Sequence, residues 1–251
     1  MQLSAILVSL ALLQAPQAKV TDTKVGEGAE ARIGDVVTIN YVGKAMNGFI
    51  FDSTRLTPPF AFELGARPLI QGHARIPFPA LDKAIVGMKV GGSRTIELPP
   101  ELGFGDMKVG EILPGSRLTF EIELFDVRAK GSEAQLKTED LKVGEGDAIK
   151  SGDTVEVHYR GTFLNGRQFD SSYGREDPNG GPPQDVPIRA VLGGRGLISG
   201  FLKGLEGMKL GGKRRVTIPY DMAYGAAGRQ GIPAYSILVF ELDLVKIVSR
   251  G

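Results

Sequence analysis

The chain has 251 residues, which allows one large domain or two small ones, each with a buried core. Its 42% hydrophobic and 24% charged residues are typical of a folded protein. Thirty basic and 29 acidic residues give a net charge of +1, which argues against a nucleic acid or an anionic membrane as partner. The absence of cysteine excludes disulfides, thiolate nucleophiles and cysteine-bound metals. With only 2 histidines, His73 and His158, we expect no metal and no cofactor, and an activity that depends on the shape of a pocket.

The amino-terminal segment differs from the rest of the chain. Residues 3–13, LSAILVSLALL, form an uncharged apolar run that is too short to span a membrane and suits a secretion signal. We expect a signal peptide over residues 1–18, cleaved after Ala18, and a secreted or periplasmic protein with no stable membrane insertion afterwards. The start MQLS lacks a basic residue, and Pro16 occupies a position before the cut that favours small residues. The alternative is a disordered or helical apolar start on a cytosolic protein.

Two copies of one unit follow the amino-terminal segment. The sequence Lys-Val-Gly-Glu-Gly at 24–28 recurs at 142–146, and Phe-Asp-Ser at 51–53 recurs at 169–171. Later matches, such as Gly-Met-Lys at 87–89 and 207–209, are 120 rather than 118 positions apart, so the copies differ in the lengths of their loops. Repeats of this size are domains. The sequence predicts a first domain over 19–128, a polar linker over 129–136 and a second domain over 137–251.

Each repeat carries the same predicted elements in chain order. A first strand alternates apolar residues at 37, 39 and 41, or at 155, 157 and 159, and Asn-Gly pairs at 47–48 and 165–166 predict hairpin turns in which both residues tolerate positive φ. Apolar residues at 81, 85 and 88, and at 201, 205 and 208, have the spacing of one buried helix face. A last strand alternates over 118–124 and 238–244. We therefore expect an α+β fold in which each antiparallel β-sheet wraps around one short α-helix, a conclusion that the 35 glycines support because they indicate many tight turns.

The second repeat resembles the FKBP family of peptidyl-prolyl cis-trans isomerases, the macrolide-binding immunophilins. The resemblance covers residues 137 to 248 nearly completely, and the first repeat is similar but less complete from about 20 to 128. Its motifs are Tyr-Arg-Gly-Thr-Phe-Leu-Asn-Gly-Arg-Gln-Phe-Asp-Ser-Ser at 159–172, Leu-Ile-Ser-Gly-Phe at 197–201, Gly-Met-Lys-Leu-Gly-Gly-Lys-Arg at 207–214, Ala-Tyr-Gly at 223–225 and Leu-Val-Phe at 238–240.

The activity that the resemblance implies needs no nucleophile. Rotation about an Xaa-Pro bond has a barrier of roughly 18 to 20 kcal/mol and breaks no bond, so a catalyst has only to stabilise the twisted amide. A twisted amide has lost resonance and much of its dipole, and a dry aromatic pocket favours it over the planar, hydrated ground state. The resemblance implies proline-containing polypeptides as clients, macrolide inhibitors of the FK506 class as ligands, and a role in protein folding.

The resemblance also assigns the pocket of the second repeat. Phe201 replaces the tryptophan often found on its floor, and Ile188 stands where a phenylalanine is common. Tyr224 is expected to offer its hydroxyl to the substrate carbonyl beside the proline, and Asp170 to line the pocket, held by Tyr159 and Arg175. The expected catalytic residues are Tyr159, Phe169, Asp170, Tyr224 and Phe240, and the expected substrate-binding residues are Ile188, Leu197, Ile198, Phe201, Ile232 and Arg175.

Local sequence alone supports plainer interpretations of these residues. The three phenylalanines fit core packing in almost any fold, and an aspartate before two serines fits a turn cap. His158 is expected on the opposite face of its strand as a solvated residue. The basic run at 213–215 is interpreted as solvated charge.

The first repeat keeps only part of this set. Phe104 takes the place of the tyrosine that would donate a hydroxyl, Leu81 takes the floor position, and Arg55 follows the aspartate by three residues instead of five. We therefore expect this repeat to bind proline-containing chains but to isomerise them slowly. The expected equivalents are Tyr41, Phe51, Asp52, Phe60, Leu69, Ile70, Leu81, Phe104 and Phe120.

Each repeat also has an insertion of its own. In the first repeat, residues 72–80 contain His73, Ile76 and Phe78 and suit a loop or a partner contact. In the second, residues 176–184 are turn-rich and adjoin the expected pocket, where they would filter substrates. The alternative function for the whole chain is a weakly catalytic or non-catalytic tandem binding module, or chaperone, whose two pockets hold one client together.

Overall fold

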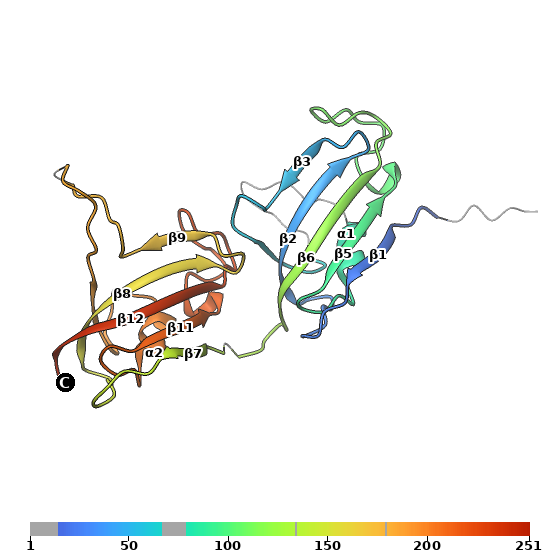
Figure 1. Ribbon diagram of the computed structural model, residues 1–251. Coiled ribbons are helices and arrows are strands. Elements are labelled where there is room, and N and C mark those ends of the chain that lie inside the picture. Colours follow the sequence, from blue (N-terminus) through green and yellow to red (C-terminus); the bar gives the residue numbers. More distant parts are fainter. Residues whose placement is uncertain (1–14, 67–78, 134, 179) are drawn as a thin grey trace, which may run out of the picture.

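The computed structural model describes residues 15–66, 79–133, 135–178 and 180–251, and it contains two six-stranded antiparallel sheets (Figure 1). This confirms the predicted α+β fold with two tandem units. The first unit contains β1 (Lys19–Lys24), β2 (Val36–Ala45), β3 (Ile50–Ser53), β4 (Phe60–Glu63), α1 (Pro79–Ile85), β5 (Ser93–Leu98), η1 (Pro100–Leu102) and β6 (Leu118–Arg128). The second contains β7 (Lys137–Lys142), β8 (Thr154–Phe163), β9 (Gln168–Ser171), β10 (Ile188–Val191), α2 (Ser199–Leu205), β11 (Lys213–Ile218), η2 (Tyr220–Met222) and β12 (Leu238–Ser249).

The two sheets have the same topology. The first has the strand order β1-β5-β6-β2-β3 with β4 also paired to β2, and the second has the order β10-β8-β12-β11-β7 with β9 also paired to β8. The last strand of each unit therefore pairs with the first long one, so that Tyr41 lies opposite Ile122 and Tyr159 opposite Leu242. This long-range pairing places two strands that are far apart in the sequence side by side inside each sheet, whereas β1 and β7, which begin the repeats, lie at an edge.

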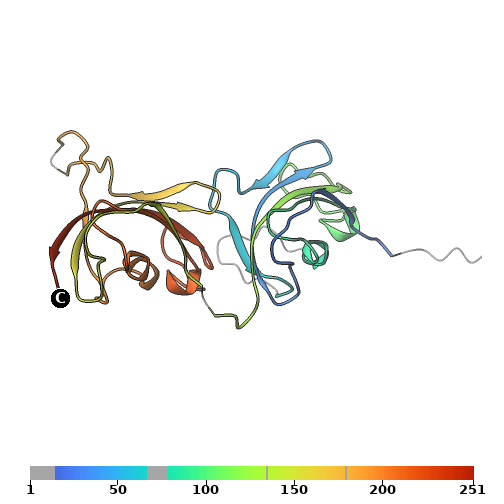
Figure 2. The ribbon, with the colours of Figure 1, turned by 60° about the horizontal axis from the view of Figure 1, so that its bottom comes forward.

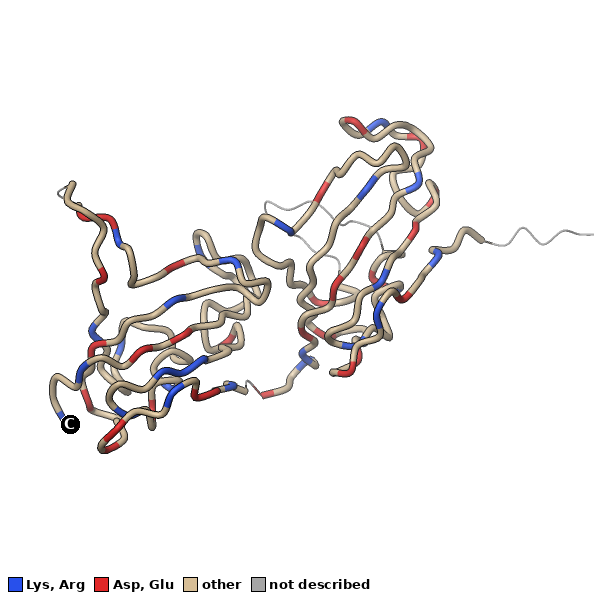
Figure 3. The backbone as a smooth tube through the Cα atoms, viewed as in Figure 1, with Lys and Arg blue, Asp and Glu red and all other residues tan. Residues whose placement is uncertain are grey.

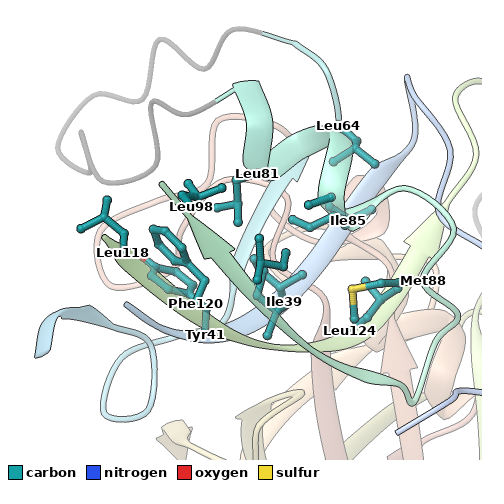
Figure 4. Packing of buried hydrophobic residues seen from close by; sticks show 14 of the residues in the cluster. Ile39, Tyr41, Leu64, Leu81, Ile85, Met88, Leu98, Leu118, Phe120 and Leu124 are labelled. Carbon is teal, nitrogen blue, oxygen red and sulfur yellow. The ribbon is translucent and has the colours of Figure 1, made fainter. Parts of the chain in front are cut away.

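One helix lies across the concave face of each sheet (Figure 2). In the first unit, Leu81 and Ile85 of α1 are directed toward Ile39 and Phe120 of the sheet (Figure 4), and all four side chains are fully buried. Burying a side chain of this size contributes about 1.5 to 3 kcal/mol. The apolar residues at 37, 39 and 41, and those at 118, 120, 122 and 124, are buried as predicted, and so are their counterparts in the second unit. Burial alternates along β6, β8 and β12, but not along β2, where Val36, Thr38 and Val42 on the other face are buried as well.

The helices are shorter than the apolar spacing predicted. Met88 and Met208 are buried as expected, but α1 ends at Ile85 and α2 at Leu205. Glycines at 87 and 207 adopt φ of 81° and 80°, a left-handed conformation that ends a helix. The methionines therefore reach the core from the turn that follows each helix.

The hairpin turns also differ from the prediction in one respect. Gly48 and Gly166 have φ of 82° and 81°, but neither Asn47 nor Asn165 adopts a positive φ. Instead, each asparagine accepts a hydrogen bond through its side-chain oxygen from the backbone N–H two residues later, at 3.1 Å in the first unit and 3.2 Å in the second. Asparagine favours these turns here through its side chain and not through its backbone.

Basic and acidic residues are spread along the chain in both units (Figure 3). The interpretation of residues 213–215 as solvated charge is wrong for Arg214, whose side chain is only 12% exposed and is paired with Asp140 at 2.6 Å. Lys213 pairs with Asp243 at 2.8 Å, and Arg215 pairs with Glu139 and Glu241, each at 2.9 Å. The basic run is therefore neutralised within its own sheet.

The end of the first sheet contacts the second unit. Arg128, the last residue of β6, donates hydrogen bonds of 2.8 and 2.5 Å to the two carboxylate oxygens of Asp221. Its guanidinium carbon lies 4.6 Å from the centroid of the Tyr220 ring. A second contact joins the units where the Asn165 amide donates to the carbonyl oxygen of Thr57 at 3.1 Å. We call the first of these, formed by Arg128, Tyr220 and Asp221, the Arg128 contact.

Candidate active site

Four aromatic rings converge inside the second sheet. Phe240 of β12 lies at their centre, with ring centroids 5.6 Å from Phe169 of β9, 5.2 Å from Phe201 of α2 and 5.8 Å from Tyr159 of β8. The first two pairs have interplanar angles of 86° and 88°, the edge-to-face geometry that aromatic pairs prefer. Each ring comes from a different element, so the cluster forms only when the sheet and helix have assembled.

The rings line a pocket of about 340 Å³, a volume that suits a small ligand or a few residues of a peptide. Of the eleven residues predicted from the sequence, nine line it. Ile232 is only 3% exposed and belongs to the hydrophobic core, and Arg175 does not line the pocket but bonds to the Tyr159 hydroxyl. The lining also includes Gly196 and Arg229, which the sequence did not indicate. The complete lining is Tyr159, Phe169, Asp170, Ile188, Gly196, Leu197, Ile198, Phe201, Tyr224, Arg229 and Phe240.

The backbone of β8 forms part of the aromatic site because Gly161 has no side chain. A Cβ atom at this position would lie 2.7 Å from Phe169 and 3.0 Å from Phe240. Contacts under 3.0 Å are essentially never seen for a real Cβ, so the rings approach the strand this closely only over a glycine. Gly43 has the same relation to Phe51 and Phe120 in the first unit.

A polar network occupies one side of the pocket. The Tyr159 hydroxyl donates to Asp170 Oδ2 at 2.6 Å and accepts from Arg175 Nη2 at 2.7 Å. Arg175 Nη2 is also 3.7 Å from Asp170 Oδ1, and the Ser171 N–H donates to that oxygen at 2.8 Å. Both partners expected for Asp170 are thus in place. Burial, reinforced by the Asp170 carboxylate, raises the pKa of Tyr159 to about 12.

Tyr224 lies on another side of the pocket, in the loop between η2 and β12. Within the described residues its hydroxyl has no hydrogen-bond partner, so it is available to a ligand. The loop backbone is held by the Gly225 N–H, which donates to the Tyr220 carbonyl at 2.7 Å, and by the Tyr235 N–H, which donates to the Gly225 carbonyl at 3.1 Å. A directional donor is therefore positioned in a pocket that is otherwise mainly apolar.

The first unit retains the centre of this arrangement. Phe51 and Phe120 meet edge to face at 5.7 Å, the Tyr41 hydroxyl donates to Asp52 at 2.6 Å, and Phe104 lies 6.3 Å from Phe51. Leu81 of α1 is fully buried and packs in the same hydrophobic cluster as Phe60, which lies 6.2 Å from Tyr41. Leu69, Ile70 and the predicted contact segment with His73, Ile76 and Phe78 lie outside the described residues.

Arg55 does not act as a counterpart of Arg175. Its guanidinium is 3.5 Å from Glu121, on β6, whereas Arg175 bonds to the tyrosine hydroxyl of its own site. The shorter spacing between aspartate and arginine in the first unit is thus accompanied by a different ion pair.

His158 is less solvated than predicted. It lies on the face of β8 opposite to Tyr159, but it is half-buried, with Nδ1 3.0 Å from Ser172 Oγ and its ring stacked on Tyr173 at 4.7 Å. Ser172 in turn accepts a hydrogen bond from the Tyr159 backbone N–H at 2.7 Å. Among the described residues there is no group of three or more histidine, aspartate or glutamate side chains arranged to hold a metal.

The chain is similar to several known proteins. Human peptidyl-prolyl cis-trans isomerase FKBP9 is 31% identical over 216 residues, which cover 85% of this chain and 35% of that protein. FkpA, an FKBP-type isomerase of Escherichia coli, is 39% identical over 118 residues, or 47% of this chain and 40% of that protein. The crystal structure of FkpA aligns with 36% identity over 47% of this chain and 53% of that one, with a TM-score of 0.39.

These relatives are longer proteins, since the matched part of the chain spans about a third of FKBP9 and 40% of FkpA. The match to the family itself is broader. The profile of FKBP-type peptidyl-prolyl cis-trans isomerases matches twice, over residues 27–125 and 145–245, and so accounts for most of the chain. With two family matches and two sheets of one topology, the chain belongs to the FKBP-type peptidyl-prolyl cis-trans isomerases.

Proposed function

We propose that this chain accelerates cis-trans isomerisation of Xaa-Pro bonds in unfolded or flexible polypeptides, and that the second repeat supplies most of the activity. The observation that carries the proposal is the 340 Å³ pocket, in which aromatic rings surround a space bordered by a free tyrosine hydroxyl and a carboxylate. A proline ring fits such an apolar cradle, and exclusion of water favours the twisted amide, which has less dipole than the planar one.

Each part of the site has a role in this proposal. The rings of Phe169, Phe201 and Phe240 seat the proline. Tyr224 donates its hydroxyl to the carbonyl beside the proline and so fixes the peptide while the bond rotates. Asp170, fixed by Tyr159 and Arg175, presents a negative edge toward the rotating amide. No covalent intermediate and no cofactor take part.

The first repeat is proposed to bind proline-containing chains and to isomerise them slowly. Phe104 has no hydroxyl to offer, and Leu81 replaces an aromatic floor. The loop between η1 and β6 nevertheless exposes apolar side chains, since Met107 is 62% exposed, Val109 39% and Leu113 52%. Exposed apolar side chains favour binding of apolar client segments, so this repeat contributes the binding function considered as the alternative for the whole chain.

The first test compares matched substitutions in the full chain. We expect Phe240→Ala to lower kcat/KM for an Xaa-Pro peptide by about tenfold or more, because one ring of the cradle is worth at least roughly 1.4 kcal/mol in the transition state. Phe120→Ala, the same change in the first repeat, is expected to cost less than twofold. NMR exchange spectroscopy on the peptide measures both.

Asp170→Ala provides an independent variant, because it removes a half-exposed carboxylate and leaves the core intact. It is expected to lower kcat/KM as well, and Asp52→Ala to have little effect. If the two first-repeat variants lost as much activity as the two second-repeat variants, the assignment of the main activity would be wrong.

A macrolide of the FK506 class is expected to compete with the peptide for the pocket of the second repeat.

We further propose that the mature domains are residues 19–128 and 137–251, joined by the linker 129–136, and that residues 1–18 direct export and are removed. Strand β6 ends at Arg128 and β7 begins at Lys137, which supports these boundaries. Residues 1–14 lie outside the described residues. No helix in the described part of the chain combines the length and the apolar character needed for a membrane crossing. Mass spectrometry of the exported protein tests the cleavage after Ala18.

A further inference from the structure

The pocket of the second repeat has a positively charged residue at its mouth. The corresponding position of the first repeat is uncharged. Arg229 lines this pocket, and its guanidinium carbon lies 4.4 Å from the centroid of the Tyr224 ring. At the corresponding place in the first repeat, five residues after Phe104, the chain has Val109. The family resemblance and the apolar spacing of the sequence gave no reason to single out Arg229.

A short hairpin fixes the position of Arg229. Its backbone N–H donates to the Ile232 carbonyl at 2.8 Å, and the Ile232 N–H donates back to the Arg229 carbonyl at 2.9 Å. Gly231 closes the turn with a φ of 79°. Ile232 is almost completely buried, so the hairpin is anchored in the core while Arg229 remains exposed. Stacking on Tyr224 then holds the guanidinium near the pocket.

The charge of Arg229 is not neutralised within the described part of the chain, where it makes no ion pair. Asp170 is the one acidic residue among those that line the pocket, and its oxygens are already engaged by the Tyr159 hydroxyl and the Ser171 N–H, with Arg175 at 3.7 Å. Arg195, next to the lining residue Gly196, is exposed and also lacks an ion pair among the described residues. The mouth therefore presents uncompensated positive charge.

We propose that Arg229 gives the second repeat a preference for clients with aspartate or glutamate immediately before the proline. This inference rests on the proposed function, in which Tyr224 binds the carbonyl of that preceding residue. A guanidinium stacked on the Tyr224 ring is then close to the side chain of the same residue. A carboxylate accepts two parallel hydrogen bonds from a guanidinium, whereas a lysine side chain in its place is repelled.

The test uses the full chain and a series of four tetrapeptides that differ only in the residue before proline, which is glutamate, glutamine, leucine or lysine. We expect the kcat/KM ratio of the glutamate to the glutamine peptide to be about two- to fivefold at low salt, as is usual for an exposed ion pair. The preference should fall toward one in 1 M salt, where the Debye length is about 3 Å. The Phe240→Ala chain, measured in parallel, gives the contribution of the first repeat to each rate.

Substitutions at position 229 separate charge from shape. Arg229→Gln and Arg229→Val, which copies the first repeat, are expected to bring the glutamate-to-glutamine ratio to about one, and Arg229→Lys to retain part of it. Arg229→Glu should reverse the order of the glutamate and lysine peptides. The matched control is Arg189→Gln, because Arg189 is an exposed arginine beside the lining residue Ile188 but points away from the pocket. This control is expected to keep the wild-type ratio.

Two negative results have different meanings. If the wild-type chain accelerates the leucine peptide but shows a glutamate-to-glutamine ratio of one, or if Arg229→Gln keeps the wild-type ratio, the inference is overturned and the proposed function stands. If the wild-type chain accelerates none of the four peptides, the proposed function fails and this inference fails with it.

Discussion

Tyr159 connects the core of the second repeat to its pocket. Its ring packs against Phe201 and Phe240, while its hydroxyl both donates to Asp170 and accepts from Arg175. Burial is the main reason why the pKa of this phenol rises to about 12, with the Asp170 carboxylate as the next cause. The hydroxyl therefore keeps its proton, and the hydrogen bond to Asp170, well into the alkaline range.

This raised pKa predicts how the isomerisation rate and the stability of the second repeat depend on pH in the alkaline range. We expect kcat/KM to show no loss from titration of Tyr159 between pH 7 and 10, because the phenol is neutral throughout. Neutral Tyr159 is favoured in the folded state, so its contribution to stability is complete below the ordinary tyrosine pKa near 10 and is lost as pH rises toward about 12. The pH profile of isomerisation, together with NMR titration of the tyrosine ring, measures this. A titration of Tyr159 midway near pH 10 would contradict it, and Tyr159→Phe identifies its signals.

Several residues of the site were accessible from sequence because they repeat. The motifs around Phe169-Asp170 and Phe240 have counterparts in both repeats at family spacing, and nine of the eleven predicted residues line the pocket. Arg229 was missed because no periodicity or counterpart marks an exposed loop arginine. Ile232 was misplaced because an apolar residue beside a pocket and one in the core beneath it have the same sequence signal.

At the scale of elements, one arginine in each repeat joins three parts of the fold. Arg214 of β11 donates to the carbonyl oxygens of Gly204 and Glu206 at the end of α2, at 3.1 and 2.8 Å, and pairs with Asp140 of β7. Arg94 makes the same kinds of contact with the end of α1 and with Asp22 of β1. These arginines satisfy helix-terminal carbonyl groups and hold the edge strand of each sheet.

Removing this arginine should therefore destabilise the repeat. We expect Arg214→Ala to lower the free energy of unfolding of the second repeat by about 1 to 3 kcal/mol, because the hydrogen bonds of a charged, largely buried side chain to Asp140 and to two carbonyl groups at the end of α2 are lost. Arg215→Ala, at the neighbouring but more exposed position, should change it by less than about 0.5 kcal/mol. Urea unfolding followed through NMR signals of the second repeat measures both. Equal effects of the two substitutions would show that the contacts of Arg214 with the end of α2 do not contribute to the free energy of unfolding.

The existence of these elements followed from sequence, but their ends did not. Alternation of apolar residues predicted the long strands, and the i, i+4, i+7 spacing located both helices. The same spacing extended each helix to Met88 or Met208, because a buried side chain in the following turn has the same pattern as one on the helix. The role of Arg214 was hidden as well, since a basic run in a strand gives no sign of the carbonyl groups that fold against it.

At the scale of the whole molecule, the Arg128 contact links the two repeats. The Arg128 side chain is 15% exposed, and its hydrogen bonds lower the pKa of Asp221, while that of Arg128 is raised. The sequence predicted a polar linker over residues 129–136. It could not reveal this contact, because Arg128 belongs to the last strand of one repeat and its partners lie more than ninety residues later, as the bond to Asp221 shows.

Loss of the contact should loosen the link between the repeats, although the hydrogen bond from Asn165 to Thr57 remains. We expect Arg128→Ala to give the two repeats more independent tumbling, seen as shorter NMR rotational correlation times and a larger radius of gyration in X-ray scattering. Lys130→Ala is the control, because the Lys130 side chain is exposed and pairs with Glu63 of the first repeat. Because the pKa of Asp221 is lowered, the contact is favoured above the ordinary aspartate range and is lost as pH falls through the lowered value. Identical tumbling of Arg128→Ala and wild type would contradict the link.

The position of Arg128 also decides how the protein can be divided. A fragment that starts in the linker lacks this arginine. The Asp221 carboxylate then loses its ion-pair partner, and the Tyr220 ring loses the guanidinium that stacks on it. Both residues belong to η2, from which the chain continues directly to Tyr224. We therefore expect rates measured on an excised carboxy-terminal half to describe an altered loop, and the rates of the two separate halves not to add up to that of the intact chain.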